Sequence, residues 1–149
     1  MQVSTFLWFD GRAEQAAVRY TGLFAGSTIL DAQRAADGRI TTVTFELAGQ
    51  RYVAYNGGPQ FSFTGAISLY ADCDTQEEVD RVWAGLADDG QEGPGGSLTD
   101  CFGVSWQVIP KAVGQLLNDA EPDAAERILT ALHAMTKIDI QGLIDARDR

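Results

Sequence analysis

The chain has 149 residues, of which 45% are hydrophobic, and it carries a formal net charge of −10. This size suffices for one ordinary domain with its own apolar core. The acidic balance disfavours a surface for nucleic acid or anionic membrane, because such a surface needs clustered lysine and arginine. No apolar run approaches the ~20 residues of a bilayer span, and residues 1–9 lack the features of a signal peptide. We therefore expect a cytoplasmic protein that binds neither nucleic acid nor membrane.

The first half of the chain predicts a strand, a helix and three further strands. Residues 3–9 are β-branched and aromatic, which is typical of a strand. Apolar residues then recur at helical spacing between Ala13 and Phe24. Three strands separated by hairpin-like glycine turns are expected at residues 27–34, 39–47 and 50–56. Residues 56–59, Asn-Gly-Gly-Pro, end this half with the strongest turn signal in the chain.

The same order of elements then begins again. Residues 66–71 predict a strand, and Thr75 with Glu78 has the spacing of a helix capping box. A hairpin is expected over residues 98–101 and 104–109, after a glycine-rich stretch whose structure stays open. Beyond it, residues 122–135 predict an amphipathic helix and residues 138–146 a shorter one.

The two halves can be superposed as an internal repeat. Asp10 matches Asp72 and Tyr20 matches Trp83 at an almost constant offset, which shrinks before the last hairpin. The second copy is therefore contracted between its helix and that hairpin. We predict a single α+β domain over residues 1–149, made of one βαβββ module at about 1–60, a second at about 61–110, and a helical extension at 111–149.

Alternation in three strands predicts one face that packs against helices and one face that is open. The residues assigned to the helix-packed faces are Phe6 and Trp8; Ile67, Leu69 and Ala71; and Val104, Trp106 and Val108. The residues assigned to the open faces are Thr5, Leu7 and Phe9; Ala66, Ser68 and Tyr70; and Ser105, Gln107 and Ile109. The mixture of apolar, hydroxyl and amide groups in the second set suits the interior of a small-molecule cup.

Several segments carry a resemblance to a known family. They are LWFDGRAEQA (7–16), TFELAGQ (44–50), NGGPQF (56–61), AISLYADCD (66–74) and DCFGVSWQVIP (100–110). The chain resembles the PhnB-like branch of the vicinal oxygen chelate, or glyoxalase/bleomycin-resistance, superfamily, whose members often carry the label 3-demethylubiquinone-9 3-methyltransferase. The resemblance implies paired βαβββ modules that form a cupped mixed sheet, often in a homodimer. Where this family often has Cys-Gly-Trp, the chain has Gly95-Gly96-Ser97, which predicts a wider cup on that side.

The superfamily's hallmark is a divalent metal held by four His or Glu ligands. By alignment with the family, those positions fall near Thr5, on Ala54 or Asn56, at Ala66 and at Gln107. Because threonine, alanine and glutamine supply no imidazole or carboxylate, we expect no metal. Residues 93–96 also do not form the G-x-G-x-x-G turn of a nucleotide site, so we expect no S-adenosylmethionine and no other cofactor.

The polar residues assigned to the cup are the candidate ligand-binding groups. They are Thr5, Glu46, Asn56, Gln60, Ser68, Tyr70, Ser105 and Gln107. The same groups are equally consistent with hydrogen bonding inside a sheet, and Glu46 with a solvated face. The three tryptophans, Trp8, Trp83 and Trp106, are expected in the core, and His133 at the polar edge of the last long helix.

Three functions stay open at this point. The favoured one is a non-metal protein that binds a small organic molecule in the cup between its two modules, because the sequence holds no catalytic pair. The second is an enzyme of the same superfamily that acts on an enolisable molecule with Glu46 or Tyr70 as base, and the third is a dimeric scaffold whose own side chains fill the cup. No catalytic residue is assigned. We expect a homodimer in which the apolar face of the helix at 122–135, with Ile128, Leu132 and Met135, covers the partner.

Overall fold

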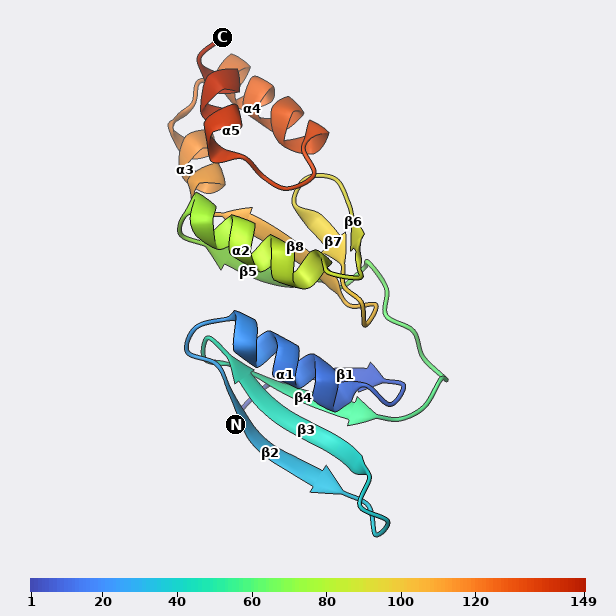
Figure 1. Ribbon diagram of the computed structural model, residues 1–149. Coiled ribbons are helices and arrows are strands. Elements are labelled where there is room, and N and C mark those ends of the chain that lie inside the picture. The colour runs from blue at the N-terminus through green and yellow to red at the C-terminus, as the bar shows by residue number, and fades with distance from the viewer. The chain divides into compact units, whose positions relative to one another are not determined.

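The computed structural model describes residues 1–149, which divide into two compact units, Met1–Phe63 and Thr64–Arg149 (Figure 1). Each unit contains one complete βαβββ module, so the predicted α+β organisation with an internal repeat is confirmed. The helices that follow the second module belong to the second unit. None of the helices is both long enough and apolar enough to span a bilayer.

The first unit is a four-stranded sheet with one helix against it (Figure 1). Its elements are β1 (Thr5–Phe9), α1 (Ala13–Leu23), β2 (Thr28–Arg34), β3 (Ile40–Leu47) and β4 (Gln50–Asn56). The strand order is β1-β4-β3-β2, with β1 parallel to β4 and the other pairs antiparallel. Small residues of α1 such as Ala16 and Ala17 let the helix lie close to the sheet, and Tyr20 packs on Phe45 with ring centroids 6.2 Å apart.

The second unit repeats this topology. Its module consists of β5 (Leu69–Cys73), α2 (Gln76–Ala87), β6 (Gln91–Glu92), β7 (Ser97–Thr99) and β8 (Ser105–Pro110). The strand order β5-β8-β7-β6 corresponds strand for strand to that of the first sheet. The predicted capping box is present, because the Thr75 hydroxyl accepts a 3.1 Å hydrogen bond from the Glu78 N–H. Glu78 in turn accepts from the Asp74 N–H at 2.7 Å.

The predicted contraction of the second module falls on β6 and β7. These strands have two and three residues, whereas β2 and β3 have seven and eight. The glycine-rich stretch left open by the sequence forms β6 and the turn into β7, where Gly95 and Gly96 both have positive φ. The β7–β6 side of the second sheet is therefore much shorter than the corresponding β3–β2 side of the first sheet.

Three helices complete the second unit and build a small core of their own. They are α3 (Ala112–Asp119), α4 (Pro122–Ala134) and α5 (Ile140–Arg147), of which the sequence predicts the last two but not α3. Their buried core residues are Val113, Ile128, Leu132, Ile138 and Leu143. Ile128 is fully buried and Leu132 is 9% exposed within this core. The expectation that this face of α4 covers a partner subunit is therefore wrong, because α3 and α5 already cover it.

Burial confirms the assignment of faces in β5 and β8 but reverses it in β1. Leu69 and Trp106 are buried under α2, as predicted, and Tyr70 is 62% exposed. In β1, Leu7 and Phe9 are buried, whereas Phe6 is 58% exposed. The prediction for β1 is wrong because both of its faces are apolar, so alternation carries no information there. Ile67, assigned to a helix-packed face, is 72% exposed because β5 begins only at Leu69.

Candidate functional site

Neutral hydrogen-bonding side chains cover the open face of the second sheet, opposite α2. Tyr70 of β5 is in register with Gln107 of β8, which is in register with Ser97 of β7. Two residues further along β7 and β8, Thr99 pairs with Ser105. Because side chains alternate across a strand, these five groups share one face, as predicted for Tyr70, Ser105 and Gln107.

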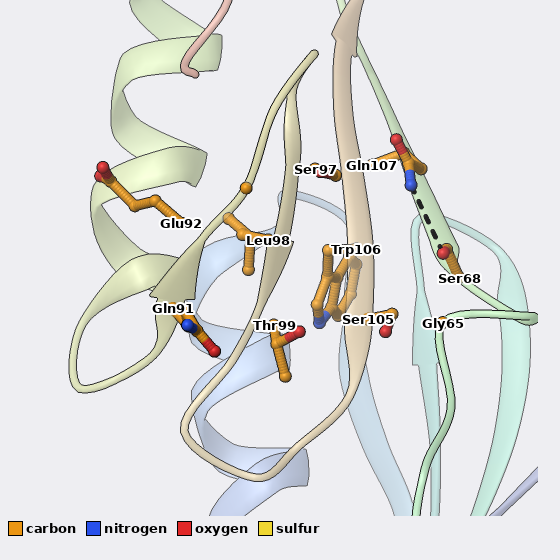
Figure 2. A pocket seen from close by; sticks show the side chains of 11 residues that line it. Gly65, Ser68, Gln91, Glu92, Ser97, Leu98, Thr99, Ser105, Trp106 and Gln107 are labelled. Carbon is orange, nitrogen blue, oxygen red and sulfur yellow. Dashed lines mark hydrogen bonds between the residues drawn. The ribbon is translucent and has the colours of Figure 1, made fainter.

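A cavity of about 350 Å³ opens on this face, and Figure 2 shows the side chains that line it. Its hydroxyl and amide groups include those of Ser68, Ser97, Thr99, Ser105 and Gln107. The Gln107 side-chain amide points toward Ser68, with 3.5 Å between Nε2 and Oγ, the long limit of a hydrogen bond (Figure 2). Both groups therefore keep hydrogen-bonding capacity for a bound molecule.

A second cavity of about 580 Å³ adjoins the first one. Ser97 and Gln107 line both cavities, whereas Ile109, Leu132 and Tyr70 line only the second one. We call the two adjoining cavities together the second-module groove. The groove has a polar end over β7 and β8 and a more apolar end beside α4, a combination typical of small-molecule sites.

A buried carboxylate holds the hairpin that forms the floor of this groove. Asp100 is 3% exposed, and its Oδ1 accepts hydrogen bonds from the N–H groups of Phe102 and Val104 at 2.9 and 3.0 Å. Its Oδ2 accepts from Trp106 Nε1 at 2.9 Å. The carboxylate thus fixes both the β7–β8 turn and the buried indole of Trp106 on the opposite face of β8.

The open face of the first sheet is aromatic instead of polar. Trp8 meets Tyr55 and Phe61 edge to face, with ring centroids 5.1 and 4.9 Å apart, and Phe6 lies 5.8 Å from Tyr55. Trp8 Nε1 donates a 2.9 Å hydrogen bond to the Gly58 carbonyl oxygen. Of the three tryptophans expected in the core, Trp83 and Trp106 are buried there, but Trp8 belongs to this open face.

Gly57 explains why this turn contains adjacent glycines. A Cβ atom at Gly57 would lie 2.2 Å from the indole ring of Trp8, far inside any van der Waals contact. Gly58 has a φ of +98°, which a residue with a side chain rarely adopts. The two glycines of the Asn-Gly-Gly-Pro turn therefore allow the Trp8 ring to pack directly against the turn backbone.

Two residues predicted to bind a ligand lie on the helix side of the first sheet. Thr5 shares the face of Leu7 and Phe9 that packs under α1. Asn56 accepts from the Ala13 N–H at 2.9 Å and donates to the Ile40 carbonyl oxygen at 3.1 Å. Its amide is committed to starting α1 and joining it to the sheet. Gln60 lies exposed in the turn after β4.

The two candidate bases, Glu46 and Tyr70, belong to different units of the chain. Glu46 lies on the open face of β3, where it is in register with Arg51 of β4. Partial burial, followed by the negative charge of Asp72, raises the pKa of Tyr70 above its usual value. The Tyr70 phenol can donate and accept a hydrogen bond to a molecule in the groove.

The side chains at the superfamily's metal positions do not fit a divalent cation. Within the first unit these positions hold Thr5 and Ala54 or Asn56, and within the second unit Ala66 and Gln107. No group of three or more His, Cys, Asp or Glu side chains is placed to hold a metal ion. Hydroxyl and amide oxygens alone, without a carboxylate or imidazole, are a weak donor set for such an ion.

Most lining residues of the second-module groove are not among the predicted site residues. They include Ser97, Thr99, Leu129, Leu132 and His133. The strand β7 covers residues 97–99, and Leu98 is its buried residue. Strand alternation then puts the flanking Ser97 and Thr99 on the open face, but the sequence predicts this strand only from residue 98. The sequence predicts the helix α4 but gives no signal that it lines the groove, because α4 lies outside both repeats. His133, expected at a polar helix edge, is exposed and also lines the apolar cavity.

Comparison with known proteins identifies the family. Residues 1–109 match the family model described as 3-demethylubiquinone-9 3-methyltransferase. The chain belongs to this family. A putative 3-demethylubiquinone-9 3-methyltransferase, PhnB protein, from Bacillus cereus is 36% identical over 74% of this chain and 99% of its own, with a TM-score of 0.69. The predicted resemblance to PhnB-like proteins that carry the label 3-demethylubiquinone-9 3-methyltransferase is confirmed.

More distant structures share the fold of the family. A protein from Pseudomonas aeruginosa is 21% identical over 74% of this chain and 97% of its own, with a TM-score of 0.63. A hypothetical protein from Staphylococcus aureus is 16% identical over 71% of this chain and 93% of its own, with a TM-score of 0.52. No curated protein matches the chain significantly.

Proposed function

We propose that this member of the 3-demethylubiquinone-9 3-methyltransferase family binds a small organic molecule, without a metal, in the second-module groove. The observation that carries the proposal is the row of neutral hydroxyl and amide groups on the open face of the second sheet, continuous with an apolar cavity. Such groups orient a ligand through hydrogen bonds, and the apolar cavity supplies the burial that stabilises it.

Binding without chemical conversion agrees with the side chains around the groove. The carboxylate of Glu92 already accepts a 2.7 Å hydrogen bond from Trp83 Nε1 and points toward α2 (Figure 2). Ser68 and Ser105 line only the first cavity, which has no imidazole among its lining residues, so neither hydroxyl has a base there to activate it as a nucleophile. The one histidine, His133, lines the second cavity together with Ser97.

The test uses the full chain and one matched pair of variants. Gln107→Leu removes the central amide of the groove at nearly constant volume, and Gln33→Leu makes the same change on exposed β2 of the first unit. Molecules retained by the purified wild-type protein, or bound from a small-molecule library, are measured by native mass spectrometry. We expect Gln107→Leu to weaken binding about tenfold or more and Gln33→Leu to leave it unchanged. Equal binding by both variants would place the ligand elsewhere.

The competing functions predict other outcomes of the same experiment. An enzyme acting on an enolisable molecule would exchange the α-protons of the bound molecule for deuterium in heavy water, with a rate that falls in Tyr70→Phe. A methyltransferase would bind S-adenosylmethionine, which we expect to be absent from the bound fraction. A scaffold with a filled cup would bind nothing.

We also propose that the protein forms a homodimer. The support is the family resemblance together with the aromatic face of the first sheet, where Phe6 and Phe61 are 58% and 66% exposed. Large exposed aromatic side chains that cluster on one face are typical of interaction surfaces. Light scattering at micromolar concentration should give twice the chain mass of 16.1 kDa. Phe6→Asp should shift that mass toward the monomer, and a wild-type monomer mass would refute the proposal.

A further inference from the structure

The helical extension lies outside the part of the chain that the family shares. The family model ends at residue 109, whereas α3, α4 and α5 span residues 112–147. The Bacillus cereus relative is covered over 99% of its own length but covers only 74% of this chain. The extension is therefore a feature that this chain adds to the shared module.

Backbone hydrogen bonds fix the extension to the edge of the second sheet. The N–H groups of Gly95 and Gly96 donate to the carbonyl oxygens of Met135 and Thr136 at 2.7 and 2.8 Å. A Cβ atom at Gly96 would lie 2.8 Å from Ile109 Cδ1 and the Val108 carbonyl oxygen of β8, and 3.1 Å from Ile138 Cγ1 of the extension. Glycine at position 96 thus lets both β8 and Ile138 lie close to this turn.

A glutamine of α2 holds the same segment from the other direction. The Gln76 side-chain amide donates to the Ile138 carbonyl oxygen and accepts from the Ile140 N–H, both at 2.9 Å. Lys137 adds an ion pair with Asp80 of α2 at 2.7 Å. These contacts give the extension a defined position relative to β7 and β8.

In this position α4 supplies one wall of the apolar cavity. Leu129, Leu132 and His133 line that cavity together with Ile109 of β8 and Tyr70 of β5. Leu129 is 41% exposed although it lies on a helix with a complete core of its own. Ser97, where relatives often have Trp, lines both cavities, and its small side chain fills less space there than an indole would.

We propose that α4 adds an apolar subsite to the groove and that the ligand is an uncharged amphipathic molecule. Its hydrogen-bonding head, such as an amide or a hydroxyl, lies over Ser68 and Gln107, and its alkyl or aromatic part lies against Leu129 and Leu132. This inference rests on the proposed function and names its ligand class. The head is uncharged because the groups beside Ser68 and Gln107 are hydroxyls and amides, whereas Glu92, the carboxylate that lines this cavity, points toward α2 and accepts from Trp83 Nε1. The net charge of −10 also disfavours an anion.

The experiment is a titration of the ¹⁵N-labelled full chain with N-butyl, N-hexyl and N-octyl acetamide, followed by NMR. Each added methylene buried against α4 should tighten binding by roughly two- to fourfold. Leu129→Asp should abolish this dependence on chain length, because it places a charge in the apolar wall without touching the buried core. Thr130→Asp, at the next exposed position of α4, should retain the dependence.

The outcomes separate this inference from the proposed function. If the amides bind and Gln107→Leu weakens them, but Leu129→Asp keeps the chain-length dependence, the α4 subsite is refuted and the proposed function stands. If hexanoate or octanoate binds more tightly than the amide of equal chain length, the uncharged class is refuted. If neither amides nor carboxylates perturb resonances of the groove, the subsite and its ligand class are refuted, whereas the proposed function is decided by the native mass spectrometry of the Gln107→Leu and Gln33→Leu variants.

Discussion

Trp106 Nε1 donates a 2.9 Å hydrogen bond to Oδ2 of Asp100, and both side chains are buried. The other carboxylate oxygen accepts two backbone N–H groups of the β7–β8 turn. One ionised side chain therefore satisfies three buried donors, which compensates for removing its charge from water. The groove depends on this arrangement because β7 and β8 supply most of its polar lining.

Asp100→Ala should strongly destabilise the protein. The change removes the acceptor of three donors: the N–H groups of Phe102 and Val104 and the indole N–H of Trp106. We expect the free energy of unfolding to fall by about 3 kcal/mol or more. Asp37 is the matched control, since its carboxylate accepts from the Arg39 N–H at 3.1 Å in the exposed β2–β3 turn. Asp37→Ala should cost less than about 1 kcal/mol. Urea denaturation of both variants measures the difference, and similar losses would contradict the role assigned to Asp100.

Trp106 and Gln107 are neighbours in sequence but should differ in their effect on stability. Trp106 is 2% exposed under α2, so Trp106→Ala should cost roughly 3–5 kcal/mol as a large core deletion. Gln107 faces the groove, where water can replace its amide, so Gln107→Ala should cost less than about 1 kcal/mol. Denaturant melts decide the order. A larger loss for Gln107→Ala would invert the assignment of faces.

Gly57→Ala should displace the indole of Trp8. The new methyl group would overlap the ring, whose Cζ2 atom lies 2.2 Å from the ideal Cβ position. We expect a loss of about 1–3 kcal/mol from overpacking and a shift in tryptophan fluorescence. Gly22→Ala on α1 has no atom within 4 Å of the new Cβ, and it should stabilise the protein by up to about 1 kcal/mol. Unchanged fluorescence in Gly57→Ala would show that Trp8 does not rest on this turn.

Cys73 should make stability fall between pH 9 and pH 11. Burial raises the pKa of the Cys73 thiol to about 11, with a further contribution from the charge of Glu78. The folded state therefore holds this proton more tightly than the unfolded chain, so the stabilisation is complete below about pH 9 and is lost as the pH rises toward 11. Cys73→Ala should have a flatter stability profile over this range, measured by urea denaturation. Parallel profiles for the wild type and the variant would contradict the raised pKa.

Much of the fold could be predicted because the physical signals in the sequence agree with one another. Local structure is specified by the glycine turns, the capping box at Thr75 and the alternation in β8. The internal repeat then predicts that the same order of elements occurs in both modules. In β1 this reasoning failed, since Phe6, Leu7, Trp8 and Phe9 are all apolar and the period of two distinguishes no face. The position of α1 buries Leu7 and Phe9 and leaves the other face to the aromatic cluster.

The candidate site was predictable where polar and apolar residues alternate. The alternation over residues 66–71 and 104–109 alone predicts Ser68, Tyr70, Ser105 and Gln107 on the open face. Ser97 was missed because β7 has only three residues, too few for a periodic signal. Leu129 and His133 are not predicted because tertiary contacts bring α4 to the groove. These contacts are the backbone hydrogen bonds of Gly95 and Gly96, which no local sequence pattern indicates.

The most direct test of the central claim is to map where a bound molecule contacts the protein. The molecule that native mass spectrometry finds on the wild-type chain is titrated into ¹⁵N-labelled protein, and the shifts of assigned backbone amides are recorded. The account predicts the largest shifts at Ser68, Ser97 and Gln107, with smaller ones at Leu132 and none above background on β2 of the first unit. Shifts that cluster on the first unit and leave Ser97 and Gln107 unmoved would contradict it.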